Sequence, residues 1–583
     1  MAKKEYRSAH QHSDIVLPNS WDFIVFAIIF GIFAALGWGF SQMATPFDLG
    51  EPLSIELSPW ALPGYAVRTV SRMLIGLSFA LLFTFTVGTL AAKNKRAEKV
   101  IIPFIDIMQS APILGFLTVA VLLFIPLFPG SLLGPECAAI FAIFTSQVWN
   151  MTLGFYQSLR LLPKEMREVA SMFGLGPWQK FWRVEVPYAT PSLLWNMMIS
   201  MSAGWFFVVA SEAITVSNQQ IHLPGIGSYI HIAVLESNNT AILWAILAMF
   251  FVILLYDQLL FRPLVAWTSR FSAEIKDDDD YQEAWFLNWL QRTRFMKLQV
   301  HLLESLKDWF VNGIGQYRLE LPFHSPRLKQ VFALSLNLFW WVGILGGSLV
   351  GLAVLMSFLY EQFTVSEVLK VFALGGITGI KVIISVILSS IIWVPVGVWM
   401  STRPKIAVMG QTIAQFLASF PANIVYPVVF GVIVAYDMNV DIWTIPLMML
   451  GTQWYILFNV IAGMSCVPSE LKLAVKNFGL RGPLLWKRFI LPSIFPYYVT
   501  GAMACAGGCW NASIVAEVIE LGNQTIRATG LGSYHQSFAV SGDFARIILS
   551  VAVMCLYVMV LNRLLWDRLY ALAEDQYSFD EVR

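Results

Sequence analysis

The sequence predicts an all-α polytopic membrane protein of about 12 transmembrane helices, arranged as two parallel six-helix repeats with pseudo-twofold symmetry. Two observations predict the class. Of 583 residues, 57% are hydrophobic and only 13% are charged, whereas globular domains carry roughly 25% charged residues. Apolar runs long enough to cross a bilayer also recur along the chain. This composition excludes a soluble multidomain protein and a disordered chain, and a net charge of +1 does not favour a nucleic-acid partner.

Twelve apolar runs are predicted to span the membrane, because a helix rises 1.5 Å per residue and must cross ~30 Å of hydrocarbon. The runs lie near 21–40, 73–92, 101–127, 133–158, 188–210 and 241–261, and then near 331–358, 377–400, 406–434, 442–466, 494–516 and 546–566. The first run is longer than the core of a signal peptide, so we expect it to be a retained helix.

Lys and Arg residues indicate which loops are cytoplasmic. They gather at the amino end and in the loops after even-numbered runs, around 93–99, 160–183, 403–405 and 472–488. The loops on the opposite side, such as 41–66 and 359–370, hold few basic residues. Both termini are therefore predicted to be cytoplasmic.

An internal repeat relates the two halves of the chain. At an offset of 305, residues from about Trp149 to Leu264 match without a net gap, and the pairs include Trp149 with Trp454, Pro163 with Pro468, Phe173 with Phe478, Trp205 with Trp510, Glu212 with Glu517 and Tyr229 with Tyr534. Upstream the offset becomes 309, which pairs Ser110 and Pro112 with Ser419 and Pro421. An even number of spans per repeat gives both copies the same orientation. The pseudo-twofold axis is then the expected place for a translocation path.

The repeat predicts three parts of the chain. Residues 1–264 form the first repeat, with a core at about 70–264, and residues 329–583 form the second, with a core at about 375–570. Between them, 265–328 is a polar linker with an acidic run and an amphipathic stretch from Tyr281 to about Phe310, typical of a helix at the membrane interface. The linker is either a simple connector or a regulatory or docking element.

A long cytoplasmic loop between the fourth and fifth spans of each repeat has a common pattern. In the first repeat it reads Glu168-Val-Ala170, three residues, Gly174, nine residues, Val184-Glu-Val186-Pro187. In the second it reads Leu473-Ala474-Val475, three residues, Gly479, nine residues, Phe489-Ile-Leu491-Pro492. The glycines suit a left-handed helix end and the prolines suit the first turn of the next helix. The segment between them is predicted to protrude, with Trp178 or Trp486 exposed until a partner covers it.

This pattern resembles the Glu-Ala-Ala loop of ABC importer permeases, the inner-membrane components of binding-protein-dependent transport. The Gly-x-Gly-Ser-Tyr segments at 225–229 and 530–534 and the Ser-x-Pro of the third span resemble the nitrate, sulfonate, taurine and bicarbonate branch. In the second copy Leu473 replaces the motif Glu. The resemblance implies that two such domains are fused in tandem, and that each loop carries a coupling helix docking on an ATPase subunit. The residues it assigns to this coupling are Glu168, Ala170, Gly174, Leu175, Trp178, Phe181, Pro187, Ala474, Gly479, Leu480, Trp486 and Pro492.

The chain has no G-x-x-x-x-G-K-[ST] phosphate loop, so it is expected to be a transport subunit without its own ATP-binding site. ATP and Mg²⁺ would be bound by two copies of a partner ATPase. The resemblance places the protein in a bacterial inner membrane and leaves open whether a periplasmic substrate-binding protein delivers the solute. No pattern for a bound metal or a catalytic residue is present, and the five cysteines are expected to pack within helices.

The predicted function is import of a small polar solute, driven by ATP. The alternatives are a secondary transporter with parallel repeats, driven by an ion gradient, and a membrane scaffold that recruits an ATPase. Candidates for the translocation path or gate are Ser110, Pro112, Asn150, Trp205, Glu212, Ser419, Pro421, Trp510 and Glu517. For the two glutamates, capping of a helix end competes with lining the outer mouth. For the two prolines, a plain kink competes with a path-facing break. Lys381 is expected to reach toward the membrane interface.

Overall fold

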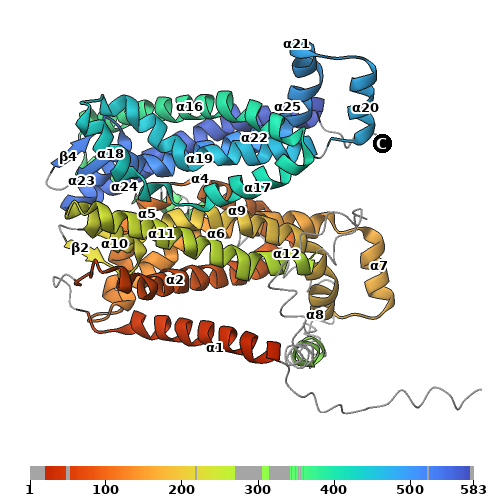
Figure 1. Cartoon of the computed structure of the whole chain (residues 1–583), viewed down its shortest axis with the longest axis horizontal. Coiled ribbons are helices and arrows are strands. Elements are labelled where there is room, and N and C mark those ends of the chain that lie inside the picture. Colours follow the sequence, from red (N-terminus) through yellow and green to blue (C-terminus); the bar gives the residue numbers. More distant parts are fainter. Residues whose placement is uncertain are drawn as a thin grey trace, which may run out of the picture. The chain divides into compact units, whose positions relative to one another are not determined.

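The computed structural model describes residues 20–47, 53–216, 219–268, 305–313, 342–465 except 343, 344, 348, 352, 355 and 359, and then 467–521 and 524–577. These residues are helical apart from connecting turns and two short hairpins (Figure 1). The predicted all-α class is therefore confirmed. Most of the amphipathic linker stretch lies outside the described residues, and only its end, 305–313, is described, as a helix.

The helices of the first repeat follow the predicted order. They are α1 (Ser20–Ser41), α2 (Leu62–Phe83), α3 (Thr89–Lys93), α4 (Lys95–Ser110), α5 (Ile113–Phe124), α6 (Leu133–Leu161), α7 (Lys164–Met172), α8 (Pro177–Lys180), α9 (Val186–Glu212), α10 (Ile226–Leu235), α11 (Asn239–Tyr256) and α12 (Arg262–Thr268). An antiparallel hairpin of β1 (Ala213–Val216) and β2 (Gln219–His222) follows α9 directly.

The second repeat has the same succession of elements. It comprises α16 (Val365–Ser401), α17 (Pro404–Ser419), η9 (Ala422–Ile424), α18 (Tyr426–Ala435), α19 (Val440–Ser465), α20 (Ser469–Asn477), α21 (Gly482–Leu485), α22 (Leu491–Ala516), α23 (Leu531–Ser541), α24 (Phe544–Leu561) and α25 (Asp567–Tyr577). Here the hairpin consists of β3 (Val518–Leu521) and β4 (Gln524–Arg527) and follows α22. Neither hairpin was predicted from the sequence.

Among the described residues, ten helices are long and apolar enough to cross a membrane, or up to eleven if a bent pair counts as one span. The bent pair corresponds to the third predicted span. It consists of two helices, Lys95–Gln109 and Ile113–Leu127, that meet at 97°. Pro112 lies at the break, where its ring and missing N–H prevent a continuous helix. The ninth predicted span, 406–434, is likewise divided, since α17 ends just before Pro421 and α18 has only 10 residues.

The chain divides into two compact units, which are described separately. The larger comprises Gly39–Gln157, Trp195–Leu254 and Leu319–Arg583, so it holds core helices of both repeats. Within it, α19 packs on α16 and α22, and α5 of the first repeat packs on α22 and α24 of the second. Asn511 of α22 accepts the N–H of Ile113 at 2.6 Å, and this satisfies a backbone donor at the start of α5.

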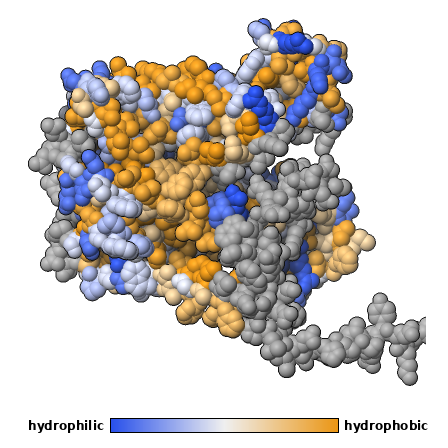
Figure 2. Space-filling view, in the orientation of Figure 1, coloured by the Kyte–Doolittle hydropathy of each residue, from blue (hydrophilic) through white to orange (hydrophobic). Residues whose placement is uncertain are grey.

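The outer faces of these helices are apolar, as a lipid environment requires. On α16, Leu369 and Ile391 expose 64% and 65% of their surface, whereas Val371 and Val382 of the same helix are buried. Figure 2 shows hydrophobic residues along α16.

The smaller unit comprises Met1–Trp38, Ser158–Leu194 and Leu255–Arg318. Its described part includes α7, α8 and the helical segment 305–313.

Candidate functional site

A buried cluster of polar and charged residues joins three helices of the first repeat, α2, α6 and α9. We call Thr69, Arg72, Glu136 and Glu212 the first buried cluster. Arg72 bonds Glu136 through Nε and Nη2 at 2.6 and 2.7 Å, and Glu212 through Nη1 at 2.6 Å. Arg72 and Glu212 are wholly buried, and Glu136 nearly so. A bidentate Arg–carboxylate pair is the strong geometry for a buried ion pair.

Glu212 also caps the helix that follows it. Its carboxylate accepts the Gly227 N–H at 2.6 Å and the Thr69 hydroxyl at 2.7 Å, while Thr69 Oγ1 accepts the Ile226 N–H at 3.2 Å. The carboxylate and the Thr69 hydroxyl thus each satisfy one free N–H group at the start of α10, where negative charge is favourable. A side chain at Gly225 would collide with this carboxylate, and one at Gly227 would collide with the backbone of Val209.

The second repeat contains the equivalent cluster. We call Thr378, Lys381, Asp441 and Glu517 the second buried cluster. Glu517 accepts the Thr378 hydroxyl at 3.0 Å and the Ser533 N–H at the start of α23 at 3.1 Å. Lys381 Nζ lies 3.5 Å from Glu517 and 3.4 Å from Asp441.

The prediction that Lys381 reaches the membrane interface is wrong. Its side chain is only 6% exposed, and Nζ donates to the carbonyl of Thr529 at 2.8 Å. Burial between two carboxylates gives the ammonium group partners that the interface would otherwise supply.

Sequence reasoning missed most of both clusters, although a signal was present. Extending the offset of 309 to the second span pairs Thr69 with Thr378 and Arg72 with Lys381, and the offset of 305 pairs Glu136 with Asp441. The hairpins also had a signal, because Gly522-Asn523 between two short apolar-alternating runs is typical of a tight turn.

A cavity of about 220 Å³ lies between the two repeats within the larger unit. We call it the repeat-interface cavity. Its described lining residues come from α5, α9, β1 and α10 of the first repeat and from η9, α18, α22, β3 and α23 of the second. They are Leu114, Leu117, Val209, Ala210, Ala213, Gly227, Ile230, His231, Val234, Asn423, Tyr426, Pro427, Phe430, Ile514, Val515, Val518 and Gln536.

Many of these residues are repeat equivalents of one another. At the offset of 305, Val209 pairs with Ile514, Ala210 with Val515, Ala213 with Val518 and His231 with Gln536. At the offset of 309, Leu114 pairs with Asn423 and Leu117 with Tyr426. Equivalent residues from both copies meet in one space only at the axis that relates the copies. The cavity therefore lies on the pseudo-twofold axis.

The residues predicted for the path lie around the cavity elements without being among its described lining residues. Pro112 and Pro421 occupy the breaks before α5 and η9, so they set the positions of Leu114 and Asn423. Ser110 ends α4 and Ser419 ends α17. Asn150 of α6 accepts a hydrogen bond from Gln109 at 2.6 Å.

The four larger path candidates are packed in the interior. Trp205 of α9 and Trp510 of α22 expose 2% and 1% of their surface. Glu212 and Glu517 are wholly buried in the two clusters. Both carboxylates accept N–H groups at the start of the following helix, α10 or α23, which is a helix-cap geometry.

The two long loops have the backbone geometry that their sequences predict. We call 164–187 the first helical loop and 469–492 the second. Gly174 and Gly479 have φ of +66° and +63°, the left-handed conformation. The N–H of Leu175 bonds the carbonyl of Ala170 at 3.1 Å, and the N–H of Leu480 bonds that of Val475 at 3.3 Å. These bonds are typical of a Schellman motif, so the predicted helix ends are confirmed.

The other predicted loop residues follow the same plan. Glu168 and buried Ala170 lie in α7, and Ala474 lies in α20. Pro187 is in the first turn of α9, and Pro492 is in the first turn of α22, as predicted.

The aromatic residue that protrudes from each loop is not the one predicted. Trp178 is half-buried, Phe181 is buried, and Trp486 packs against the core of the larger unit. Instead Phe173 and Phe478, just before the left-handed glycines, expose 78% and 82% of their surface. Met172 beside Phe173 is 86% exposed. The sharp turn at glycine directs the preceding aromatic side chain outward, and an exposed apolar knob of this kind is typical of an interaction site.

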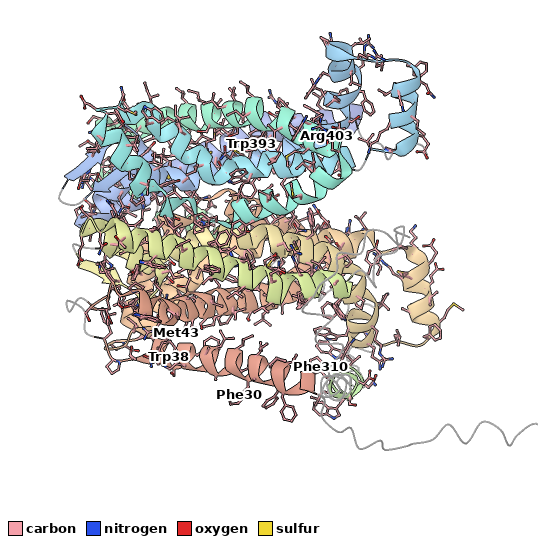
Figure 3. All side chains as sticks on the ribbon, in the orientation of Figure 1. Phe30, Trp38, Met43, Phe310, Trp393 and Arg403 are labelled. Carbon is pink, nitrogen blue, oxygen red and sulfur yellow. The ribbon has the colours of Figure 1, made fainter. Side chains whose placement is uncertain are left out.

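Trp178 is half-buried because the helical segment 305–313 covers it. The Phe310 ring lies 5.3 Å from the Trp178 ring and 6.0 Å from that of Trp182 (Figure 3 labels Phe310). Trp178 Nε1 donates to the Phe310 carbonyl at 3.3 Å, and Arg183 Nη2 lies 3.4 Å from Asp308. This end of the linker is therefore attached to the first helical loop.

Two segments of the chain, 84–262 and 393–570, match the family described as binding-protein-dependent transport system inner membrane component. Together they make up more than half of the sequence. The chain belongs to this family. Each match lies within one repeat and includes its helical loop, its hairpin and its half of the cavity lining, so the tandem pair of permease domains is confirmed.

Several permease components of known transport systems are similar to this chain. The glycine betaine/proline betaine transport system permease protein ProW of Escherichia coli (strain K12) is 27% identical over 213 residues, which are 36% of this chain and 55% of that protein. The bicarbonate transport system permease protein CmpB of Synechococcus elongatus is 24% identical, over 35% of this chain and 67% of that protein. The nitrate import permease protein NrtB of Synechocystis is 25% identical, over 33% and 64%. The chain thus spans about half to two thirds of the length of these relatives.

Proposed function

We propose that this chain is the transmembrane permease subunit of an ATP-driven importer for a small polar solute. The observation that carries the proposal is the pair of helical loops, which present the same apolar knob, Phe173 or Phe478, on the same glycine-terminated helix. A separate ATPase subunit would bind each knob, so two copies are expected. ATP and Mg²⁺ would be held by these partners, and this chain would supply no ATP-binding site.

The repeat-interface cavity supports a path between the two repeats. Closure of two ATPases would move the helical loops, and the helices that follow these loops, α9 and α22, reach the cavity through Val209 and Ile514. A rigid-body movement of packed helices is a common way to open and close such a space. The broken spans before Leu114 and Asn423 place non-helical backbone beside the cavity, where membrane proteins tolerate it.

The family and the distribution of basic residues support a proposal for the setting of the chain. We place the chain in a bacterial inner membrane with both termini and both helical loops in the cytoplasm, because Lys and Arg gather on that side. The family description also favours a periplasmic substrate-binding protein as a further partner, which would dock at the opposite end. The relatives named for betaine, bicarbonate and nitrate indicate a small polar cargo.

The test is affinity purification of the tagged full chain from its native membranes, with mass spectrometry of the proteins that accompany it. Phe173→Asp and Phe478→Asp place a charge in the proposed contact without filling the protein interior, since both side chains are exposed. Trp60→Asp is the matched control, because Trp60 is 91% exposed but lies outside both loops. We expect an ATPase with a phosphate loop to accompany the wild type and the control, and to be lost from the two loop variants.

The rival function is a secondary transporter driven by an ion gradient. If the wild-type chain brings no ATPase from membranes, the paired knobs lack a partner and this rival replaces the proposal. Its distinguishing result would be solute uptake into vesicles that hold an ion gradient but no ATP.

A further inference from the structure

The repeat-interface cavity has two chemically different walls. The first repeat contributes Leu114 and Leu117 from α5, and the second contributes Asn423 and Tyr426 at the equivalent places. At these two pairs of equivalent positions the first repeat is therefore apolar, whereas the second carries an amide and a phenol; the first repeat adds the imidazole of His231 from α10. A solute in this space can meet water-excluding surface on one side and hydrogen-bonding groups on the other.

Two polar atoms of the lining residues are buried without a hydrogen-bond partner. Within the described part of the chain, these are Asn423 Oδ1 and His231 Nε2. Tyr426 differs, because its hydroxyl donates to the Leu447 carbonyl at 3.1 Å. Buried polar groups are normally paired, and those that are not call for a functional explanation. A bound solute would supply the missing partners.

The structure also holds these groups in place. Asn423 lies in η9, directly after the break at Pro421. His231 follows Gly227 by about one turn of α10, and the Gly227 N–H is fixed on Glu212 of the first buried cluster. The cluster therefore positions the helix that carries His231.

The described residues that line the cavity offer nothing to neutralise a net charge. None of its described lining residues is Lys, Arg, Asp or Glu. Arg72 and Lys381 are engaged by carboxylates in the two buried clusters. Burial lowers the pKa of His231, so its imidazole is neutral near pH 7. An ion in this space would give up part of its hydration without gaining a counter-charge from these residues, which is unfavourable.

We propose that Asn423 and His231 form a solute-binding site in the transport path, and that its ligand is a small solute without net charge, either uncharged or zwitterionic. Its polar group bonds the two side chains, and its apolar part lies against Leu114 and Leu117. A cavity of about 220 Å³ limits the ligand to a small molecule. This inference rests on the proposed function, since it takes the cavity as part of the path.

The first test needs no ligand and measures thermal unfolding of the full chain in detergent. Asn423→Leu places at this position the residue type found at the equivalent Leu114. If Asn423 is retained for binding, this change leaves the unfolding temperature unchanged or raises it, because it removes an unpaired buried amide. Asn511→Leu is the matched control, and it should lower the temperature because Asn511 holds the Ile113 N–H. An equal loss in both variants would assign Asn423 a structural role and overturn the proposal.

The second test measures which molecules enter the cavity. The probe is a Leu117→Cys variant of the full chain, treated with 2-carbamoylethyl or 2-carboxyethyl methanethiosulfonate. The thiolate attacks the thiosulfonate sulfur, a mixed disulfide forms, and methanesulfinate leaves. The two reagents have nearly the same size but only the second is charged. A Trp60→Cys variant, at a site that is 91% exposed, gives the intrinsic ratio of their rates.

After this normalisation, we expect the neutral reagent to modify Cys at position 117 at least about tenfold faster than the anionic one, because the anion enters without a counter-charge. Asn423→Leu, combined with Leu117→Cys in one chain, should reduce this preference for the neutral 2-carbamoylethyl reagent. Equal rates, a faster anionic reagent, or no modification by either would each overturn the proposal. Recovery of the ATPase partner depends on Phe173 and Phe478 and not on these side chains, so a failure here is distinguishable from a failure of the importer function.

Discussion

Arg72 and Lys381 occupy equivalent positions in the two repeats, and each lies beside a glutamate that is wholly buried, Glu212 in one case and Glu517 in the other. The arginine satisfies its partners through three short bonds between guanidinium and carboxylates. The lysine is 3.4 and 3.5 Å from its carboxylates, and one of these, Asp441, is 47% exposed. The same structural role is therefore filled by a strong ion network in one repeat and by a weaker one in the other.

This difference predicts unequal losses of stability. Arg72→Met should destabilise the protein by about 3–5 kcal/mol, because it leaves two buried carboxylates without their cation. Lys381→Met should cost less, because Asp441 remains partly hydrated. Thermal unfolding of the purified chain would measure both, with Lys370→Met on the exposed surface of α16 as the control. An equal effect of the Arg72 and Lys381 substitutions would contradict this account.

The left-handed glycines predict an effect on the helical loops. Gly174→Val and Gly479→Val force a β-branched residue to positive φ, at a cost of about 1–2 kcal/mol or more per site. We expect the end of α7 or α20 to reorganise, ATPase recovery to fall and the unfolding temperature to drop modestly from the strained backbone, with no added steric clash because nothing lies within 4 Å of either glycine Cβ position. Gly31→Val, in an open helical position, is the control. Unchanged ATPase recovery from both loop variants would show that the motif is not needed for coupling.

The contact between the linker and the first helical loop predicts local protection. Phe310→Ala removes the ring that covers Trp178 and Trp182, and should raise amide hydrogen exchange in residues 177–185 by about tenfold. Trp309→Ala is the control, because the Trp309 side chain, next to Phe310 in sequence, is 74% exposed. Hydrogen-exchange mass spectrometry of the full chain measures both. The contact is unimportant for this loop if the two variants give the same exchange.

A buried histidine predicts a loss of stability in acid. Burial lowers the pKa of His535 in α23 to about 4, and its Nδ1 lies 2.9 Å from the Ser550 hydroxyl. As the pH falls, the histidine of the unfolded chain is protonated first, near its ordinary pKa of about 6.5. The contribution of the neutral group is therefore present above about pH 6.5 and is lost as the pH falls toward 4. His535→Asn should flatten that part of the profile of unfolding temperature against pH, whereas an unchanged slope would exclude His535 as its source.

Much of the fold was predictable because it depends on local and periodic features. Apolar run length located the spans, and the repeat gave their parallel orientation. The break in the third span could be expected at Pro112, but its 97° bend depends on tertiary partners such as Asn511, which bonds Ile113 from 398 residues further along the chain.

The site was less predictable for the same reason. Glu212 and Glu517 were found through the repeat, yet whether a carboxylate caps a helix or faces a path depends on neighbours such as Thr69 and Arg72, which the chain brings together only on folding. Trp178 was expected to be exposed because the packing of segment 305–313 on it is non-local. The exposed Phe173 and Phe478 were visible in the sequence as repeat partners, but their exposure depends on the turn geometry at the following glycine.

The two helical loops differ at the positions that contact the linker. Trp178 and Trp182 of the first loop correspond to Pro483 and Lys487 of the second, so the surface that Phe310 covers has no equivalent there. A permease assembled from two identical chains presents every probe twice, and a spectroscopic signal from it averages two environments. In this fused chain a single fluorophore or spin label at position 173 or 478 reports on one site alone. The protein therefore allows the movement of each half during an ATP cycle to be followed separately.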